Sequence, residues 1–196
     1  MIENIEPWVK EKLKEHPKRL KHVYGVAETA KKLAVIHHVS EEKAWIAGIF
    51  HDIAKYDSLE MQMNKIDLRW IKAYADYPVI YHAIAAANIL EHEFRVHDQD
   101  ILMAIRHHVW GRKEMSKLEK IIFVADLCEP NRDFPDTSYL FDLACKDLDY
   151  AVMYSMEQTL KYLESKGLKP SLEQLEALNY YQEVNRGKTK DNHSNT

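Results

Sequence analysis

The chain has 196 residues, which is long enough to bury a substantial hydrophobic core, and we expect one domain. Hydrophobic residues make up 46% and charged residues 30%, a balance that is typical of folded soluble proteins and excludes general disorder. The formal net charge of −4 gives no overall field that would attract nucleic acid or an anionic membrane, so an anionic ligand requires a local positive patch.

The cysteine content and the lack of long apolar runs indicate a reducing, cytoplasmic setting. Two cysteines, Cys128 and Cys145, are too few for a disulfide framework, and their spacing matches no zinc pattern. The N-terminal stretch MIENIEPWVKEKLKEH is amphipathic and lacks the apolar core of a signal peptide. No segment approaches the roughly 18 consecutive apolar residues of a membrane span. We expect a soluble protein that binds neither membranes nor nucleic acid.

Apolar residues recur at helical spacing, and only five glycines and six prolines interrupt them. This pattern predicts an all-α helical bundle that forms a single domain over residues 1–185. The last stretch, RGKTKDNHSNT, has no apolar residues and is expected to be a flexible tail over residues 186–196. The predicted helices span residues 5–15, 20–37, 41–55, 61–74, 78–94, 98–109, 116–128, 138–166 and 171–184.

Local signals mark several of these helix ends. Ser40 is expected to begin one helix, and Ser116 with Glu119 forms a capping-box pattern at the start of another. Gly111 and Gly167 stand where left-handed C-terminal caps are expected.

The segment IFHDIAK, residues 49–55, places a histidine, a carboxylate and a lysine among apolar residues. In a continuous helix, His51 shares a face with small residues that would let another helix approach, and Asp52 lies about 100° further round. His51 and Asp52 can both bind one cation only if the cation lies between the two helix faces that carry them. A salt-bridged or helix-capping pair explains His51 and Asp52 without a metal, and a solvated helix end explains Lys55.

A second carboxylate interrupts an apolar run in LEKIIFVADLC. Asp126 lies within residues 121–128, whose other members are all apolar. An isolated ionised carboxylate is very costly there, so it must be neutral, paired or bound to a metal. A buried pair with Arg106 and a metal site are equally consistent with this position.

Three further histidines lie on apolar helical faces. They are His22, with Val26 one turn later, His82 in VIYHAIAAANIL, and His108 in ILMAIRHH. Helical phase favours His108 over His107 for the inward role. Each histidine alone is explained by a hydrogen-bonded position in or near the core.

Together, the ionisable residues on apolar faces form a set that single explanations do not cover. Inward imidazoles and carboxylates are how helical bundles build two-metal sites. These donors suit iron, manganese or zinc better than calcium or magnesium, and one aspartate would bridge two ions. The set consists of His22, His51, Asp52, His82, His108 and Asp126.

The order H…HD…H…H…D resembles the HD-domain phosphohydrolase superfamily. More specifically, the chain is similar to the YqeK family of symmetrical bis(5'-nucleosyl)-tetraphosphatases over about residues 15–181. The strings that carry this resemblance are EHPKRLKHVYGVAETAKKLA, GIFHDIAKY, YHAIAAANIL, DILMAIRHHVWGR, LEKIIFVADLCEPNR and LEALNYY.

The resemblance implies an HD-domain helical bundle in which the six residues hold a di-iron centre, with Asp52 bridging. The family usually has Tyr at the position of His107, in agreement with the helical phase. Val109 and Trp110 depart from the family, which usually has small hydroxyl residues there, and this bears on a phosphate contact and on base preference. The residues implied to contact nucleotide or phosphate are Arg19, His22, Lys55, His82, His108, Gly111, Arg132 and Asn179.

Purely structural roles for these pocket residues remain open. Arginine offers a planar fork for phosphate oxygens, but Arg19 and Arg132 would also suit surface ion pairs. A helix cap explains Gly111 as well as a substrate contact does.

The expected function is hydrolysis of diadenosine tetraphosphate to two ADP by a hydroxide that bridges two divalent metal ions. Asp52 and Lys55 are expected to be catalytic, the latter by neutralising phosphate charge. The expected partner is a dinucleoside polyphosphate or nucleoside diphosphate, and pairing into a homodimer stays open. Three alternatives stay open: a broader nucleotide phosphohydrolase of the HD-domain type, a metal-bound purine nucleotide sensor without turnover, and a plain bundle with satisfied core histidines.

Overall fold

The all-α prediction is confirmed by the computed structural model, which describes residues 4–132 and 136–194 and has no strand within those ranges. A 3-10 turn, η2 (Pro78–Ile80), precedes α6. In chain order the helices are α1 (Ile5–Lys12), α2 (Pro17–Ile36), α3 (Glu41–Phe50), α4 (Leu59–Met63), α5 (Leu68–Ala73), α6 (Tyr81–Glu93), α7 (Gln99–Arg106), α8 (Lys117–Cys128), α9 (Thr137–Lys146), α10 (Leu148–Ser165) and α11 (Leu172–Ser194).

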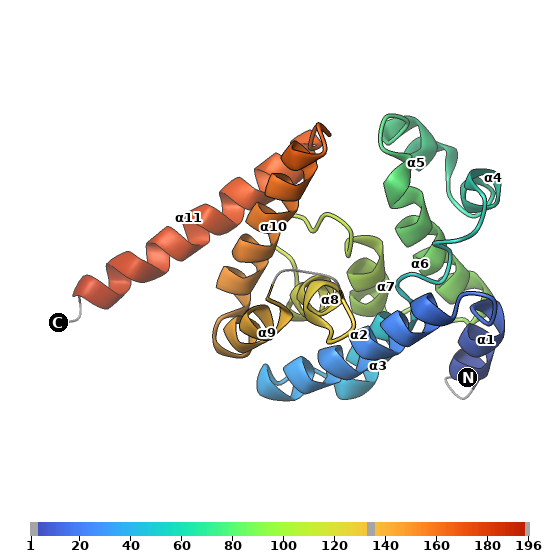
Figure 1. Ribbon diagram of the computed structural model, residues 1–196, viewed down its shortest axis with the longest axis horizontal. Helices are drawn as coiled ribbons and strands as arrows, with labels where there is room; N and C mark the ends of the chain where they lie inside the picture. Colours follow the sequence, from blue (N-terminus) through green and yellow to red (C-terminus); the bar gives the residue numbers. More distant parts are fainter. Residues whose placement is uncertain (1–3, 133–135, 195–196) are drawn as a thin grey trace.

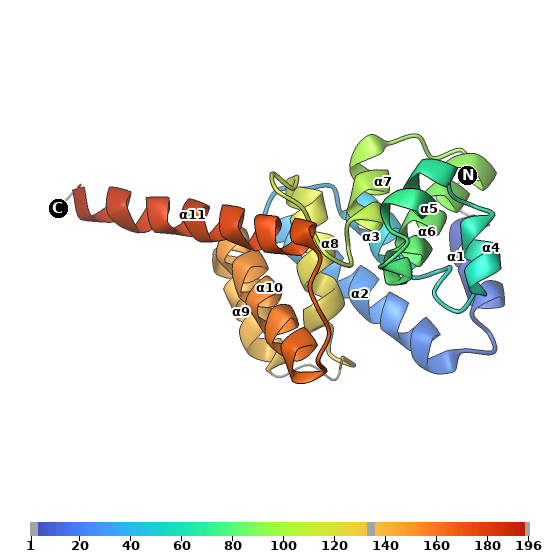
Figure 2. The ribbon, with the colours of Figure 1, turned by 90° about the horizontal axis from the view of Figure 1, so that it is seen from above.

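The middle of the molecule is formed by α2, α3, α7 and α8. Figures 1 and 2 show α1 and α4 to α6 on one side of these helices and α9 to α11 on the other, with the end of α11 extending away from the body. None of the helices in the described part of the chain is both long enough and apolar enough to cross a bilayer.

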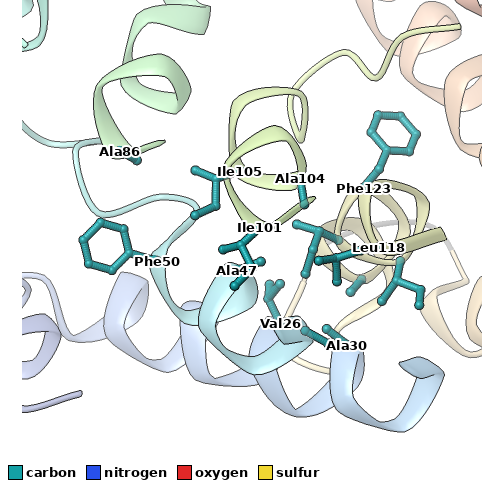
Figure 3. Packing of buried hydrophobic residues seen from close by; sticks show 14 of the residues in the cluster. Val26, Ala30, Ala47, Phe50, Ala86, Ile101, Ala104, Ile105, Leu118 and Phe123 are labelled. Carbon is teal, nitrogen blue, oxygen red and sulfur yellow. The ribbon is translucent and has the colours of Figure 1, made fainter. Parts of the chain in front are cut away.

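The core lies between the central helices, where their apolar faces meet (Figure 3). Burial of these side chains is the main source of stability, since an amphipathic helix gains little from intrinsic propensity alone. The labelled core residues are Val26 and Ala30 of α2, Ala47 and Phe50 of α3, Ala86 of α6, Ile101, Ala104 and Ile105 of α7, and Leu118 and Phe123 of α8.

The expected close approach at the small residues before His51 is confirmed. A Cβ atom added to Gly48 would lie 2.7 Å from the Cα of Ala27 on α2. That distance is too short for any side chain, so glycine at this position sets how closely α2 and α3 pack. The same contact fixes the end of α3 that carries His51.

Replacing Gly48 by valine is therefore expected to lower the free energy of unfolding by about 1–3 kcal/mol, because overpacking forces backbone shifts. Gly187→Ala on α11 is the control, since an added Cβ there meets nothing within 4 Å. The control is expected to stabilise the protein by up to about 1 kcal/mol, the helix-propensity gain of alanine over glycine. Urea unfolding followed by circular dichroism measures both. A Gly48→Val protein as stable as the wild type would contradict this packing.

Three predicted helices end or divide earlier than expected. The helix predicted over residues 61–74 is two short helices, α4 and α5. The helix predicted over residues 138–166 is divided at Asp147, whose extended backbone and side-chain oxygen cap the start of α10. The helix predicted over residues 41–55 ends at Phe50, and the following residues form successive turns with hydrogen bonds between residues three apart. His51 and Asp52 therefore follow α3 instead of lying within it.

The C-terminal segment also differs from its prediction. The expected tail over residues 186–196 is helical as far as Ser194, as part of α11. Lys188 Nζ lies 2.8 Å from Asp147 Oδ1 and 2.9 Å from Asp149 Oδ2, so ionic contacts hold this polar part of α11 beside the start of α10. Residues 195 and 196 lie outside the described ranges, and the single domain over residues 1–185 stays a prediction.

The caps predicted at Ser40, Ser116 and Gly167 are confirmed, whereas Gly111 has a left-handed φ but does not cap a helix, because α7 ends at Arg106. Ser40 caps α3, and Ser116 forms a reciprocal capping box with Glu119 at the start of α8. Gly167 follows α10 with a φ of +67°, which glycine adopts without strain. The N–H of the next residue donates to the carbonyl of Leu163, which completes a Schellman motif.

Candidate metal centre and substrate cleft

The structure brings the six predicted metal ligands to one buried place between the central helices and α6. All six are buried, and the most exposed of them, Asp126, is 9% exposed. The elements that supply them are α2 for His22, the end of α3 for His51 and Asp52, α6 for His82, the residues after α7 for His108, and α8 for Asp126.

Asp52 lies between two pairs of histidines. Its Oδ1 is 3.0 Å from His82 Nε2 and 3.4 Å from His108 Nε2. Its Oδ2 is 3.6 Å from His51 Nε2 and 3.9 Å from His22 Nε2. The two oxygens of one carboxylate thus face two different imidazole pairs, which is the arrangement that a bridging ligand requires.

Asp126 completes the second of these groups. Its Oδ1 lies 3.0 Å from His22 Nε2 and 3.6 Å from His51 Nε2. The alternative prediction, a buried ion pair between Arg106 and Asp126, is wrong. Arg106 Nη1 contacts the sulfur of Met103 instead. A different arginine, Arg132, places its Nη1 3.5 Å from Asp126 Oδ1.

Three of the histidines share one ring orientation. The Nδ1 atoms of His51, His82 and His108 each lie 2.6 to 2.8 Å from the backbone carbonyl three residues earlier. A carbonyl oxygen can only accept, so each Nδ1 carries a proton, and Nε2 is the ring nitrogen that is directed toward the cluster as a potential metal ligand. Metal-binding histidines are commonly oriented in this way.

His22 is oriented by a carboxylate that sequence reasoning missed. Its Nδ1 lies 3.0 Å from Oε1 of Glu129, which is fully buried. The other oxygen of Glu129 accepts from the backbone and side-chain nitrogens of Asn131, at 2.7 and 2.9 Å. Glu129 belongs to the EPNR string that was noted, but a role was assigned only to Arg132 in that string. A carboxylate behind a metal-binding histidine is a frequent supporting contact.

Several atoms at the centre of the cluster have no hydrogen-bond partner within the described residues, although other ligand atoms lie close to them. Buried polar atoms without partners are rare in folded proteins and call for an ion or a water. Inward lone pairs and carboxylate oxygens at this density fit divalent metal ions with nitrogen and oxygen ligands. The unpartnered atoms are His22 Nε2, His51 Nε2, Asp52 Oδ1 and Asp126 Oδ1.

The protonation states of the cluster suit metal binding. Burial acts to raise the pKa of Asp52, but the neighbouring histidines outweigh it and hold that pKa well below its ordinary value. The pKa of Asp126 is likewise held well below its ordinary value, with His22 and His51 opposing the effect of burial. Burial lowers the pKa of His82 to about 4. At neutral pH the carboxylates are therefore anionic and His82 is neutral, the forms that bind metals.

A cleft of about 1050 Å³ opens over the cluster. One wall comes from α2 and the turns after α3, and another comes from α10 and the start of α11. The side chains that carry positive charge into it are Lys18, Arg19, Lys55, Arg132 and Lys161. Within the described lining their acidic counterparts are the two metal-site aspartates, so the cleft supplies the local positive patch that the acidic chain lacks overall.

Three of the predicted phosphate-binding residues border the cluster. Arg19 Nη1 donates to Asp52 Oδ2 at 2.5 Å, and Lys55 Nζ lies 3.3 Å from His82 Nε2. Arg132 reaches Asp126 as described above. All three therefore line the cleft and contact residues of the metal cluster, instead of forming ion pairs on the surface.

Three other predicted pocket residues, His82, Gly111 and Asn179, are not among the described residues that line the cleft. Gly111 lies after His107, to whose carbonyl its N–H donates at 2.8 Å, and its φ is +69°. A turn conformation that favours glycine accounts for this residue. Asn179 is exposed on α11. Their role in nucleotide binding stays a prediction.

The outward position of His107 agrees with its helical phase. Its Nδ1 lies 2.9 Å from Oε1 of Glu119, and Arg112 donates to both oxygens of the same carboxylate at 2.8 Å. Burial opposes ionisation of Glu119, but these two partners and the backbone N–H of Ser116 lower its pKa to about 2. This carboxylate ties together the two ends of the connection between His108 and α8.

Stability is therefore expected to fall as the pH is lowered from about 4.5 to 2. The folded-state pKa of Glu119 is below its ordinary value of 4.5, so its contribution is complete above pH 4.5 and is lost as the pH approaches 2. The difference corresponds to about 3 kcal/mol. Urea unfolding of Glu119→Gln and wild type at pH 7 and pH 3 measures this. A stability difference that does not shrink at pH 3 would contradict the assignment.

Part of the cleft wall was not predicted from the sequence. Trp110 is 6% exposed and meets Tyr74 and Tyr77 edge to face, with ring centroids 5.7 and 5.4 Å away. The sequence had marked Val109 and Trp110 only as a departure from the family. The lining residues outside every string singled out in the sequence are Gln158, Thr159, Lys161, Tyr162, Leu163 and Gln174.

Comparison with known proteins gives consistent matches over most of the chain. A family model described as HD domain matches residues 19–131. A protein of Staphylococcus aureus named "Bis(5'-nucleosyl)-tetraphosphatase, symmetrical" is 37% identical over 187 residues, which covers 92% of this chain and 94% of that protein. A protein of Bacillus subtilis with the same name is 41% identical over 160 residues, which covers 81% of this chain and 85% of that protein.

A solved structure has the same fold. It is the crystal structure of a Clostridium acetobutylicum protein described as a predicted HD superfamily hydrolase involved in NAD metabolism. The TM-score is 0.83 at 32% sequence identity, and the match covers 94% of this chain and 98% of that chain.

Proposed function

Because the chain belongs to the HD-domain family, and within it to the symmetrical bis(5'-nucleosyl)-tetraphosphatases, we propose that it hydrolyses diadenosine tetraphosphate to two molecules of ADP. The observation that carries the proposal is the cluster of inward imidazole lone pairs and anionic carboxylates beneath a cationic cleft. Such a cluster is costly to bury and has no structural use that a hydrophobic core would not serve better.

The six ligands divide into two groups that share Asp52. One group consists of Asp52 with His82 and His108. In the other, His22 and His51 face Asp52 and Asp126. We propose that each group holds one divalent cation, most simply iron, with manganese or zinc accepted by the same donors. A pair of divalent ions held by these ligands would supply an activated water as the nucleophile and would withdraw charge from the phosphate oxygens.

The chain's own cations position the polyphosphate. Lys55 lies beside His82 and can neutralise an oxygen of the scissile phosphate without leaving its turn. Arg19 and Arg132 reach the two aspartates from the cleft, so their guanidinium groups can clamp the adjacent phosphates bidentately. Lys18 and Lys161 also line the cleft and add to its positive charge.

The size of the cleft supports a long substrate. At about 1050 Å³ it is at the upper end of the range for small-molecule sites, which is roughly 300–1,000 Å³. Symmetrical cleavage requires the middle of the tetraphosphate to lie over the metals and a nucleoside to extend to either side. The lining reaches from Tyr56 after α3 to Tyr162 on α10, with the metal ligands between these segments in the fold.

The test of the proposal is product analysis. Purified protein loaded with Fe(II) or Mn(II) is given diadenosine tetraphosphate, and the nucleotides are separated by anion-exchange chromatography. We expect ADP as the single product, in a ratio of two per substrate consumed. Formation of AMP with ATP, or no turnover with any metal, would contradict it.

A second candidate is a broader HD-domain nucleotide phosphohydrolase, which the bulky Trp110 in the cleft favours, because it changes the wall beside His108. A panel of nucleoside di- and triphosphates and cyclic dinucleotides distinguishes it by comparing kcat/KM. A nucleotide sensor would instead bind ADP with an intact metal centre and show no turnover. The cytoplasmic location and a homodimer remain predictions of the same proposal.

A further inference from the structure

The orientation of one buried amide in the cleft is fixed by the chain itself. Gln174, in the first turn of α11, is 7% exposed. Its Oε1 accepts from the backbone N–H of Ser171 at 2.9 Å, and Ser171 Oγ accepts from the backbone N–H of Gln174 at 3.2 Å. A backbone N–H can only donate, so the atom facing it must be the oxygen, and the other end of the amide must be the NH₂ group.

This NH₂ group is available to a ligand. Gln174 Nε2 has no hydrogen-bond partner among residues 4–132 and 136–194, and Gln174 is part of the cleft lining. The described atoms that are fully buried without a partner do not include Gln174 Nε2, so this donor is accessible, and its fixed orientation offers a hydrogen bond to an acceptor of a molecule bound in the cleft.

The wall around this donor is apolar, unlike the rest of the cleft. Val109, Trp110 and Phe123 line both the cleft and the small adjoining hollow that Gln174 also borders. Among the charged lining residues, Arg19, Lys55 and Arg132 lie beside the metal ligands, whereas Lys161 lies on α10 two residues after Thr159, a polar residue that also borders the hollow. Val109 and Trp110 directly follow the ligand His108, so this apolar end begins next to the metal centre.

The apolar end is held in place by contacts between distant segments. Tyr77 packs edge to face against Trp110 and donates through its hydroxyl to the carbonyl of Pro170 at 3.4 Å. Pro170 is next to Ser171, which caps Gln174. The tryptophan and the amide donor are thus fixed relative to each other before any ligand binds, which lowers the entropy cost of binding.

We propose that this apolar end is a subsite for one nucleobase of the substrate, in which Gln174 Nε2 donates to a ring nitrogen or carbonyl oxygen of the base. The inference rests on the proposed function for the identity of the substrate as a nucleotide. The chemistry of the cleft matches such a ligand, because its cationic part suits phosphates and its apolar part suits a flat ring with acceptors on its edge. Gln174 is therefore a binding residue that sets base recognition, not a catalytic residue.

The direct test compares ADP with inorganic tripolyphosphate as ligands of the Mn(II)-loaded protein by calorimetry. Gln174→Glu keeps an oxygen for the Ser171 N–H, because glutamate and glutamine serve equally in a capping box, but it replaces the donor with an acceptor. We expect the Kd for ADP to rise about 5- to 10-fold relative to the Kd for tripolyphosphate, the loss of one hydrogen bond. The ratio of the Kd for ADP to the Kd for tripolyphosphate is used because the negative charge added by glutamate acts on both ligands.

Two further variants separate recognition from folding. Gln174→Leu removes the donor without adding charge and should show the same selective loss for ADP. Ser171→Ala removes the hydroxyl cap but keeps the amide, and it should leave the ratio of the two Kd values unchanged. If Gln174→Glu and Gln174→Leu weaken ADP and tripolyphosphate equally, or weaken neither, the subsite is wrong.

The outcome is independent of the hydrolysis test. Selective loss of ADP binding supports the subsite even if diadenosine tetraphosphate is not cleaved, in which case only the proposed function fails. Turnover to ADP with no selective loss in the Gln174 variants overturns the subsite and leaves the proposed function standing.

Discussion

Asp52→Asn is expected to lower kcat for diadenosine tetraphosphate by more than about 100-fold and to reduce the metal content of the purified protein. Residues that only support a metal ligand already cost 10- to 100-fold when replaced, and Asp52 faces both groups of ligands directly. Asparagine keeps the size of the side chain but removes the negative charge that two cations would share. Steady-state assays and elemental analysis measure the two effects.

Asp57→Asn is the matched control for this variant. Asp57 lies five residues further on, outside the described cleft lining, and pairs with Lys12 through its Oδ1. Its replacement should leave kcat and metal content within about 2-fold of the wild type, since partly exposed ion pairs contribute little. An Asp52→Asn protein that keeps its metal and its kcat would show that Asp52 is not a ligand.

Glu129→Gln is expected to weaken metal binding by about 10- to 100-fold, although Glu129 is too far back to be a ligand of the cluster itself. Its two oxygens accept from three donors, the His22 ring and two nitrogens of Asn131. A glutamine has only one oxygen, so its NH₂ group must face at least one of these donors. The glutamine oxygen keeps two hydrogen bonds when it faces Asn131, so the NH₂ group is expected to face the His22 ring, which then loses the contact that holds its Nε2 toward Asp126.

Metal titration of the apo-protein tests this role, with Glu28→Gln as the control, an exposed glutamate on the same helix as His22. Gly25→Ala is a second variant, because the added methyl group would meet the Glu129 carboxylate. Both Glu129→Gln and Gly25→Ala should weaken metal binding, whereas Glu28→Gln should not. Unchanged metal affinity in both Glu129→Gln and Gly25→Ala would mean that His22 needs no support from Glu129.

The ligand set could be predicted from the sequence because burial of ionisable residues is visible in helical periodicity. His22, His82 and Asp126 stand on faces whose other members are apolar, and the structure buries all of them. The predicted ligand set holds although one local prediction was wrong. Because α3 ends at Phe50, the predicted helical angle between His51 and Asp52 does not apply. His51 and Asp52 directly follow α3, and both side chains are still buried.

The supporting residues could not be predicted in the same way, because they depend on contacts between distant segments. Gln174 is separated from His108 by 66 positions of sequence, and no spacing indicates that α11 returns to the cleft. Glu129 follows α8 directly, but its contact with α2 depends on how closely those helices pack at Gly25. Asp147 shows a third limit, since an aspartate within an apolar pattern can either continue a helix or cap a new one.

The central claim is that the six buried ligands hold two divalent cations. Its most direct test is elemental analysis of the protein purified without added metal, repeated after incubation with Fe(II) and desalting. We expect close to two metal ions per chain in the wild type and a clear loss in Asp52→Asn. One ion or none in the wild type after incubation would contradict the account.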